Sequence, residues 1–243
     1  MIKSVSRKSL AAIAWLVLAG AAGAVETGTA QGVRPDAFAV GEGVKETLVV
    51  GSNVQIGEIV ETGKKGQVEL LFGEGTKLVV GPASSLVLED YLLRGGNSAG
   101  KFTVNALAGT FRFVTGNMSK QSYQITTPTG TIGVRGTEFD FAVDPQGRVT
   151  LVLYEGSVEM CSSGGQCSVI SADNGCAIGA TTTADRPFRE QDLEPRGFAS
   201  RFPYLVSQSA LSEPFRLAAV PACATSLQVT TRSIGQPVQV SPN

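Results

Sequence analysis

The feature that most constrains this chain is the alternation of apolar residues with mostly polar ones over short runs that are followed by turns containing glycine. Two runs show it most clearly: Val68, Leu70 and Phe72 in one, and Phe139, Phe141 and Val143 in the other. A period of two places successive side chains on opposite faces of a strand, and glycine supplies the positive φ that tight hairpins require. The alternation therefore predicts β-hairpins with one face in a core.

The turn residues support an all-β body over residues 44–183. Glu74-Gly75 separates two alternating runs, and Asp144-Pro145-Gln146-Gly147 separates two more. Pro at the second position and Gly at the last are typical of a tight turn. Glu155-Gly156 is interpreted as a further turn into a strand at 157–161, and 102–114 and 123–127 are also predicted strands.

The remainder of the chain is less periodic. Residues 25–43, rich in Gly, Ala and Thr, are expected to form a flexible segment that leads into the β body. Residues 184–243 are expected to form a C-terminal appendage and tail, in which Phe198, Phe202 and Leu205 recur at helical spacing while Pro203 limits the helix to a short one.

The first 24 residues resemble a secretory signal peptide. Lys3, Arg7 and Lys8 precede an apolar stretch of roughly ten residues, too short to span a bilayer as a helix, and small residues follow. Cleavage is expected between Ala24 and Val25, with a periplasmic or secreted product. Removing the leader takes away three of the 20 basic residues and none of the 21 acidic ones, which leaves a formal charge of −4. Because basic residues are scattered and no later segment is long and apolar, neither nucleic-acid binding nor a membrane span in the mature chain is expected.

Four cysteines in an exported chain favour two disulfides, for which three pairings exist. Cys161 and Cys167 flank an expected hairpin tip, so the favoured pairing is Cys161–Cys167 with Cys176–Cys223. A zinc site is the alternative, but the chain contains no His and no pair of C-x-x-C motifs.

The absence of His also removes the usual general base of Ser and Cys nucleophile systems, and no cofactor is expected. Carboxylate chemistry stays open, because Glu138 and Asp140 project from one face of a strand and could form an acid and base pair. The alternative interpretation is a solvated outer face. Gly130, Gly133 and Gly136 are interpreted as sites of bending or close packing.

Two stretches resemble the FecR domain family. The first runs from Val54 to Pro82 and includes Glu74-Gly75-Thr76 in its hairpin. The second runs from Tyr123 to Phe139 and contains Thr127-Pro128 and Val134-Arg135-Gly136-Thr137; Glu155-Gly156-Ser157-Val158 follows. The resemblance implies a periplasmic all-β module that binds or signals, built as a roll or short solenoid or, as the alternative, a two-sheet sandwich. Well-known members relay an outer-membrane transport signal to a cytoplasmic sigma factor.

Three functions follow as hypotheses. The first is a non-enzymatic binding or scaffold module that contacts an envelope protein or a surface polymer of unknown identity. The second is a sensor component of a FecR-type signalling system whose membrane partner is a separate chain. The third is a His-independent glycan hydrolase. The candidate residues for a ligand or partner are Arg112, Arg135 and Glu138: the two cations are expected to anchor loops or a carboxylate such as Glu138, or to bind an anionic group.

Overall fold

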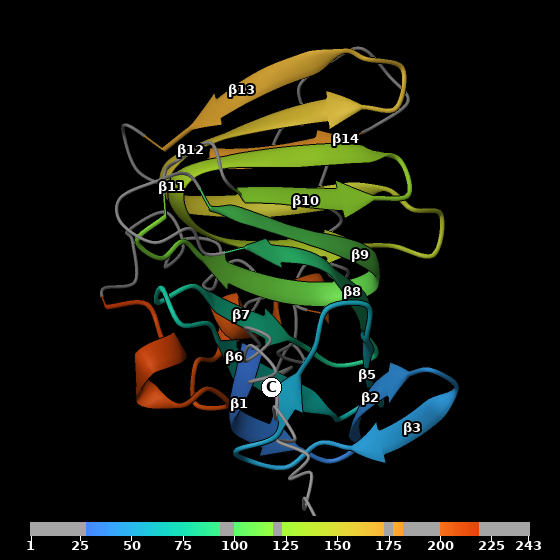
Figure 1. Ribbon diagram of the computed structural model, residues 1–243. Coiled ribbons are helices and arrows are strands. Elements are labelled where there is room, and N and C mark those ends of the chain that lie inside the picture. The colour runs from blue at the N-terminus through green and yellow to red at the C-terminus, as the bar shows by residue number, and fades with distance from the viewer. Residues whose placement is uncertain (1–27, 93–99, 119–122, 173–176, 182–199, 219–243) are drawn as a thin grey trace, which may run out of the picture.

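The computed structural model describes residues 28–92, 100–118, 123–172, 177–181 and 200–218, and this part of the chain is mostly β-strand (Figure 1). Fourteen strands join in one mixed sheet. Their bounds are β1 Gly28–Arg34, β2 Ala37–Gly41, β3 Val44–Thr47, β4 Asn53–Val54, β5 Ile59–Thr62, β6 Gln67–Leu71, β7 Lys77–Val80, β8 Ser85–Leu92, β9 Lys101–Val114, β10 Tyr123–Thr127, β11 Gly130–Val143, β12 Val149–Ser162, β13 Cys167–Ser171 and β14 Ala177–Thr181. The prediction of an all-β fold is confirmed.

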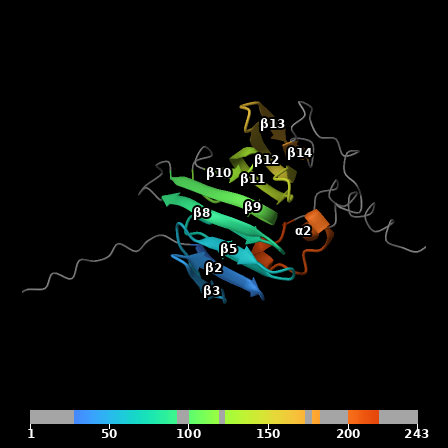
Figure 2. The same ribbon diagram turned by 90° about the vertical axis from the view of Figure 1, so that its right-hand side faces the viewer.

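The sheet is folded over on itself, so that its two halves face each other across the core. The first layer has the order β3-β2-β5-β8-β9-β10-β11-β12-β13 and the second has the order β4-β1-β6-β7-β9-β11-β12-β14. Figure 2 shows the succession of strands from β3 to β13. Every pairing is antiparallel except that of β9 with β10, which makes the fold a rolled sheet and not a solenoid of parallel coils.

Three strands of 14 residues, β9, β11 and β12, belong to both layers and bend as they pass between them. Each contains a glycine with positive φ: Gly109, Gly136 and Gly156. The set of residues that faces the core changes at these glycines. In β11 the even-numbered Ile132 and Val134 face the core before Gly136, and the odd-numbered Phe139 and Phe141 face it afterwards. An extra residue in a strand produces this change and increases the local bend.

The core lies between the layers and is rich in aromatic rings. Phe72, beside the second layer, packs edge-to-face on Tyr91 and Phe102 of the first, with ring centroids 5.2 and 4.8 Å apart. Phe111 stacks on Phe141 at 4.8 Å. The inward positions predicted from alternation are buried in this cluster: Val68, Leu70, Phe72, Leu78, Val80, Phe139, Phe141, Val143, Val149, Leu151 and Leu153.

Two sequence-based boundaries are wrong. Residues 25–43 are not a flexible segment throughout, because β1 and β2 occupy 28–34 and 37–41 and bury Ala30, Ala37 and Ala39. Alanine gives only a faint alternation, which explains the error. Glu155-Gly156 is not a turn: β12 continues through it to Ser162, and Gly156 lies so close to Gly136 that a Cβ would sit 1.9 Å from its carbonyl oxygen.

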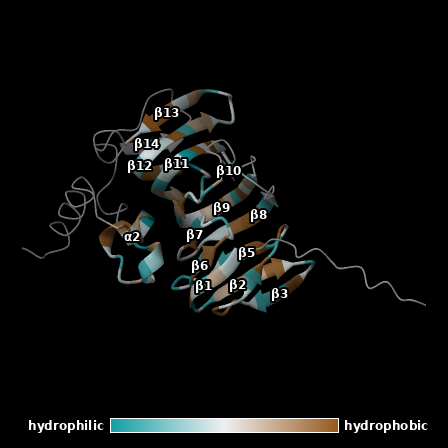
Figure 3. Cartoon of the chain, turned by 60° about the vertical axis from the view of Figure 1, so that its left-hand side comes forward, coloured by the Kyte–Doolittle hydropathy of each residue, from teal (hydrophilic) through white to brown (hydrophobic). Residues whose placement is uncertain are grey.

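The C-terminal appendage packs on the outer face of the second layer. The short helix α2, Pro203–Val206, and the 3₁₀ turn η2, Glu213–Phe215, lie beside β6 and β7 (Figure 3). Tyr204, Leu211 and Phe215 form a second apolar cluster with Val79 of β7. The predicted short helix is therefore present next to Phe202 and includes Leu205, whereas Phe198 lies outside the described residues.

Several predictions fall outside the described residues. These are the leader at 1–24, cleavage between Ala24 and Val25, the tail beyond residue 218, and any pairing of Cys176 with Cys223. Within the described ranges, none of the helices has the length and apolar character needed to cross a membrane.

Candidate functional site: a glycine-floored hollow on the first layer

The outer face of the first layer is exposed where β10, β11, β12 and β13 run side by side. The strand register arranges its side chains in cross-strand rows. One row consists of Gln124, Gly133, Glu159 and Val169. A second contains Thr131, Cys161 and Cys167, and a third contains Arg135, Ser157 and Ser171. The alternate residues Ile132 and Val134 point into the core, which fixes the orientation of the whole face.

A hollow of about 270 Å³ lies on this face; its lining residues are Tyr123, Gln124, Thr131, Gly133, Val134, Arg135, Glu159 and Cys161. Its floor is open because Gly133 carries no side chain between Gln124 and Glu159. A Cβ at Gly133 would meet nothing closer than 3.7 Å, so neither close packing nor positive φ explains this glycine. The interpretation of Gly133 as a site of bending or close packing is therefore wrong, whereas Gly136 does mark a bend and Gly130 does pack closely against Cys161.

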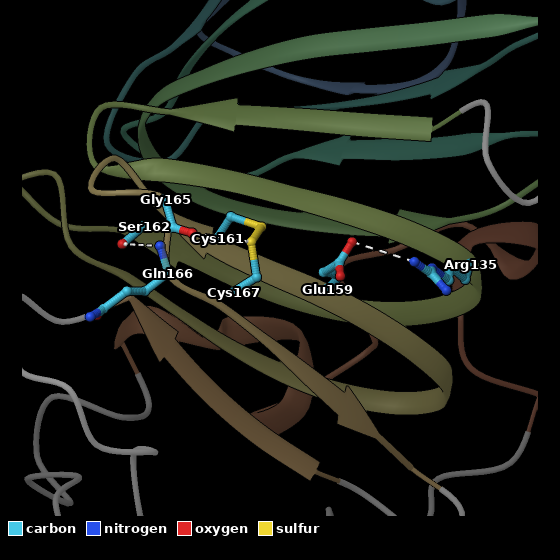
Figure 4. The surroundings of a disulfide bond; sticks show 7 residues. All are labelled: Arg135, Glu159, Cys161, Ser162, Gly165, Gln166 and Cys167. Atoms are coloured by element: carbon cyan, nitrogen blue, oxygen red, sulfur yellow. Dashed lines mark hydrogen bonds and ion pairs between the residues drawn. A yellow bond between two sulfur atoms is a disulfide. The ribbon is translucent and has the colours of Figure 1, made fainter.

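A charged pair stands at one side of the hollow. The Arg135 guanidinium lies 3.4 Å from the Glu159 carboxylate, and the two side chains are 54% and 38% exposed (Figure 4). Arg135 therefore pairs with a carboxylate, as one of the interpretations had it, but the partner is Glu159 and not Glu138: Arg135 lies opposite Ser157, and the bend at Gly136 separates it from Glu138. An exposed ion pair of this kind stabilises the fold by less than about 1 kcal/mol. Arg135 and Glu159 can therefore each give up the other for a group of a binding partner at little cost.

The Cys161–Cys167 disulfide stands at the other side of the hollow and confirms the first of the two predicted bonds (Figure 4). The two cysteines are a directly opposed pair of β12 and β13, with Cα atoms 4.0 Å apart. The bond closes a loop with a sequence separation of six and ties β13 to β12. The rim of the hollow is therefore held by a covalent link.

The other two predicted ligand residues lie elsewhere. Glu138 is half-buried at the bend of β11, where burial raises its pKa against the opposing influence of Arg112. Arg112 is 1% exposed on the outer face of the second layer, beneath the C-terminal appendage. The three candidates thus do not form one site.

Arg112 is the centre of a buried polar cluster. Its Nε and one terminal nitrogen donate to the two oxygens of Asp140 at 2.6 and 2.9 Å. The other terminal nitrogen donates to Gln208 at 2.9 Å, and the Tyr154 hydroxyl donates to Asp140 at 2.9 Å. Burial opposes the charge on Arg112, but the charge and hydrogen bonds of Asp140, with smaller contributions from Tyr154 and Glu138, together raise the Arg112 pKa. Through Gln208, the cluster links the C-terminal appendage to Arg112 of β9 and Asp140 of β11, so its role is to anchor the appendage.

Because Asp140 belongs to this cluster, it is not available as the catalytic partner of Glu138 in the hypothetical acid and base pair. Asp140 is 1% exposed and bound to Arg112 and Tyr154, so it is not on a solvated face, as one interpretation had it. A glycosidase needs two carboxyl groups that face the sugar across an open cleft. Glu138 and Asp140 do not provide such a cleft, and the geometry argues against the hydrolase hypothesis.

Sequence reasoning missed Gln124, Gly133 and Glu159. The available signal was the alternation of Thr131, Gly133 and Arg135 with Ile132 and Val134, which already places the first three on the outer face. The contribution of Glu159 depends on the β11–β12 register, which shifts at a bend within the two strands that the sequence alone does not reveal.

Comparison with known proteins gives one domain match. Residues 58–159 match the family model described as FecR protein, so the chain contains a FecR domain. This span includes all the lining residues of the hollow except Cys161. No curated protein matches the chain.

Two crystal structures of a proposed anti-sigma factor from Parabacteroides distasonis ATCC 8503 are similar in part. Each is 12% identical, with TM-scores of 0.37 and 0.36, and each comparison covers 51% of this chain and 59% of that chain. The match thus spans about three fifths of the other protein.

Proposed function

We propose that this chain is an exported, non-enzymatic component of a FecR-type signalling system, and that it acts by binding a separate envelope protein through the glycine-floored hollow. The observation that carries the proposal is the hollow itself: a depression with an exposed ion pair and a disulfide at its rim, almost wholly inside the span that matches FecR. The alternative of a scaffold on a surface polymer uses the same face and differs only in the ligand.

The chemistry of the hollow suits a polar partner segment with both charges. Arg135 offers a planar, fixed cation for a carboxylate, and Glu159 accepts from a cationic side chain. Their mutual bond is long and exposed, so a partner that replaces it gives up little. A side chain of the partner would enter the space above Gly133, between Gln124 and Glu159.

The absence of His from the whole sequence supports a binding role over a catalytic one. Within the part of the chain that the structure describes, the buried carboxylate Asp140 is committed to Arg112 and Tyr154, and this polar cluster anchors the appendage.

The experiment is crosslinking in the bacterial envelope followed by recovery of the tagged protein, with Gly133→Val as the test variant. A Cβ at position 133 would meet no atom closer than 3.7 Å, and valine suits a strand, so the variant is expected to keep the fold while filling the floor. Arg135→Ala is the second test. Arg148→Ala is its matched control, because Arg148 is 56% exposed and also ion-paired, to Asp144, but lies away from the hollow in the turn between β11 and β12.

An envelope protein recovered with the wild type and the Arg148→Ala variant, and lost with the Gly133→Val and Arg135→Ala variants, supports the proposal. Equal recovery by all four proteins would place the binding surface elsewhere. Recovery of glycan in place of protein would favour the polymer scaffold instead.

A further inference from the structure

Strand β13 is an exposed edge of the first layer. Among the strands that the structure describes, it pairs with β12 alone and ends the path of the sheet. Four of its five residues are exposed, and Val169 is 64% exposed. Its sequence, CSVIS, contains no charged residue and no proline. Edge strands usually carry such residues because they prevent pairing with another strand, so β13 is an edge open to pairing.

The register identifies the backbone groups that face outward from β13. The flanking hydrogen bonds run from Ser162 N to Gln166 O at 2.8 Å and from Ala172 N to Gly156 O at 3.0 Å. Hydrogen-bonded and non-hydrogen-bonded pairs alternate along an antiparallel ladder. The odd-numbered residues of β13 therefore belong to the non-hydrogen-bonded pairs and direct their N–H and C=O groups away from β12; these residues are Cys167, Val169 and Ser171.

This outward pattern is symmetrical about Val169. If two copies approach antiparallel with the two Val169 residues opposite each other, Cys167 of one copy lies opposite Ser171 of the other. Every outward N–H then meets an outward C=O, so each copy donates from three residues. A two-fold axis requires such a self-complementary surface.

Charge and rigidity favour the same arrangement. No charge lies on the axis because β13 has none, and Glu159 stands one strand behind Val169. At about 4.8 Å per strand, the two Glu159 residues would lie three strands apart, roughly 14 Å, beyond the Debye length at physiological salt. The Cys161–Cys167 disulfide already holds β13 in place, which lowers the ordering cost of association.

We infer that the partner of this edge is a second copy of the chain, joined β13 to β13 antiparallel with Val169 on the two-fold axis. The two first layers then form one continuous sheet, and the two glycine-floored hollows lie on the same face of it. The dimer would present two copies of the Arg135 and Glu159 pair to a partner at once.

The test is sedimentation equilibrium of the chain from Val25 onward, over a concentration series, with Val169→Lys and Val169→Thr variants. Lysine places two like charges directly opposite each other on the axis, so the dimer dissociation constant is expected to rise about tenfold or more. Threonine keeps the shape and the strand propensity and is expected to leave the constant within about threefold of the wild type. Neither change touches the ladder with β12, because Val169 directs its backbone groups outward.

Hydrogen exchange of assigned amides gives an independent readout. In the dimer the amides of Cys167, Val169 and Ser171 are expected to gain protection as concentration rises, whereas Ser168 and Ile170, already bonded to β12, stay unchanged. A wild-type chain that stays monomeric to about millimolar concentration overturns the inference, as does a dimer that Val169→Lys leaves intact or whose new protection lies at other amides.

Discussion

Replacing Asp140 with Asn tests whether the buried polar cluster anchors the C-terminal appendage. The substitution keeps the shape of the side chain but leaves the Arg112 guanidinium, 1% exposed, without its counter-charge. Removing one member of a buried ion pair costs about 3–5 kcal/mol, because an uncompensated charge stays buried. Typical domains have a free energy of unfolding of about 5–15 kcal/mol, so the loss is a large fraction of the total.

The assay is urea-induced unfolding of the chain from Val25 onward, followed by far-UV circular dichroism, because the only Trp in the sequence, Trp15, lies in the predicted leader. Asp90→Asn is the matched control. Asp90 pairs with Lys101 at 2.8 Å on the surface, and removing that pair is expected to cost about 1 kcal/mol or less. Trypsin cleavage after Arg201 and Arg216 is expected to quicken in the Asp140→Asn variant, since Arg112 also contacts Gln208 and the Phe215 carbonyl.

The double variant Arg112→Met/Asp140→Leu separates anchoring by charge from anchoring by packing. Apolar residues of similar volume often replace a buried pair at little cost, so its loss is expected to be well below the sum of the two single losses. A cost under about 1 kcal/mol for Asp140→Asn, or strict additivity in the double variant, would refute the reasoning.

Two further predictions concern the bend of β11 and β12. Burial raises the pKa of Glu138 above its ordinary 4.5, because the half-buried site favours the neutral carboxyl over the carboxylate. The stability that the neutral carboxyl contributes is fully present below pH 4.5 and is lost as the pH rises through the pKa of the folded state. Glu138→Gln is therefore expected to raise the free energy of unfolding at pH 7 and leave it unchanged near pH 4; an equal effect at both pH values would contradict this. Gly156→Ala is expected to lower the midpoint of thermal unfolding strongly, by an equivalent of about 2 kcal/mol or more, because φ is +81° and a Cβ would sit 1.9 Å from the Gly136 carbonyl. Gly133→Ala, whose Cβ would meet no atom closer than 3.7 Å, is the control, and similar midpoints for the two variants would show that the bend tolerates a side chain.

Alternation with strong apolar residues was enough to predict the strands that fill the core. Val68, Leu70, Phe139 and Phe141 are large, so their period of two is unambiguous, and all are buried. Where the inward residues are Ala30, Ala37 and Ala39, the same period is too weak to separate a strand from a flexible segment.

The bends and the buried charges were not predictable because they depend on partners distant in sequence. Glu155-Gly156 has the local sequence of a hairpin turn. That Gly156 lies within a continuous strand depends on the pairing of β12 with β11, which bends beside it at Gly136. Arg112 and Asp140 each stand between two phenylalanines, which places them on the outer face. The sequence did not indicate that residues 200–218 would cover that face and bury them.

The continuity of β11 and β12 through the bend has a structural consequence. Arg135 at the hollow and Asp140 at the anchored appendage lie five residues apart on one strand, and Glu159 and Tyr154 lie five apart on the next. A hydrogen-bonded strand resists stretching, and Gly136 and Gly156 sit side by side where both strands fold. The polar cluster and the hollow are therefore joined by continuous strand backbone, and no loop lies between Arg135 and Asp140 in β11 or between Tyr154 and Glu159 in β12.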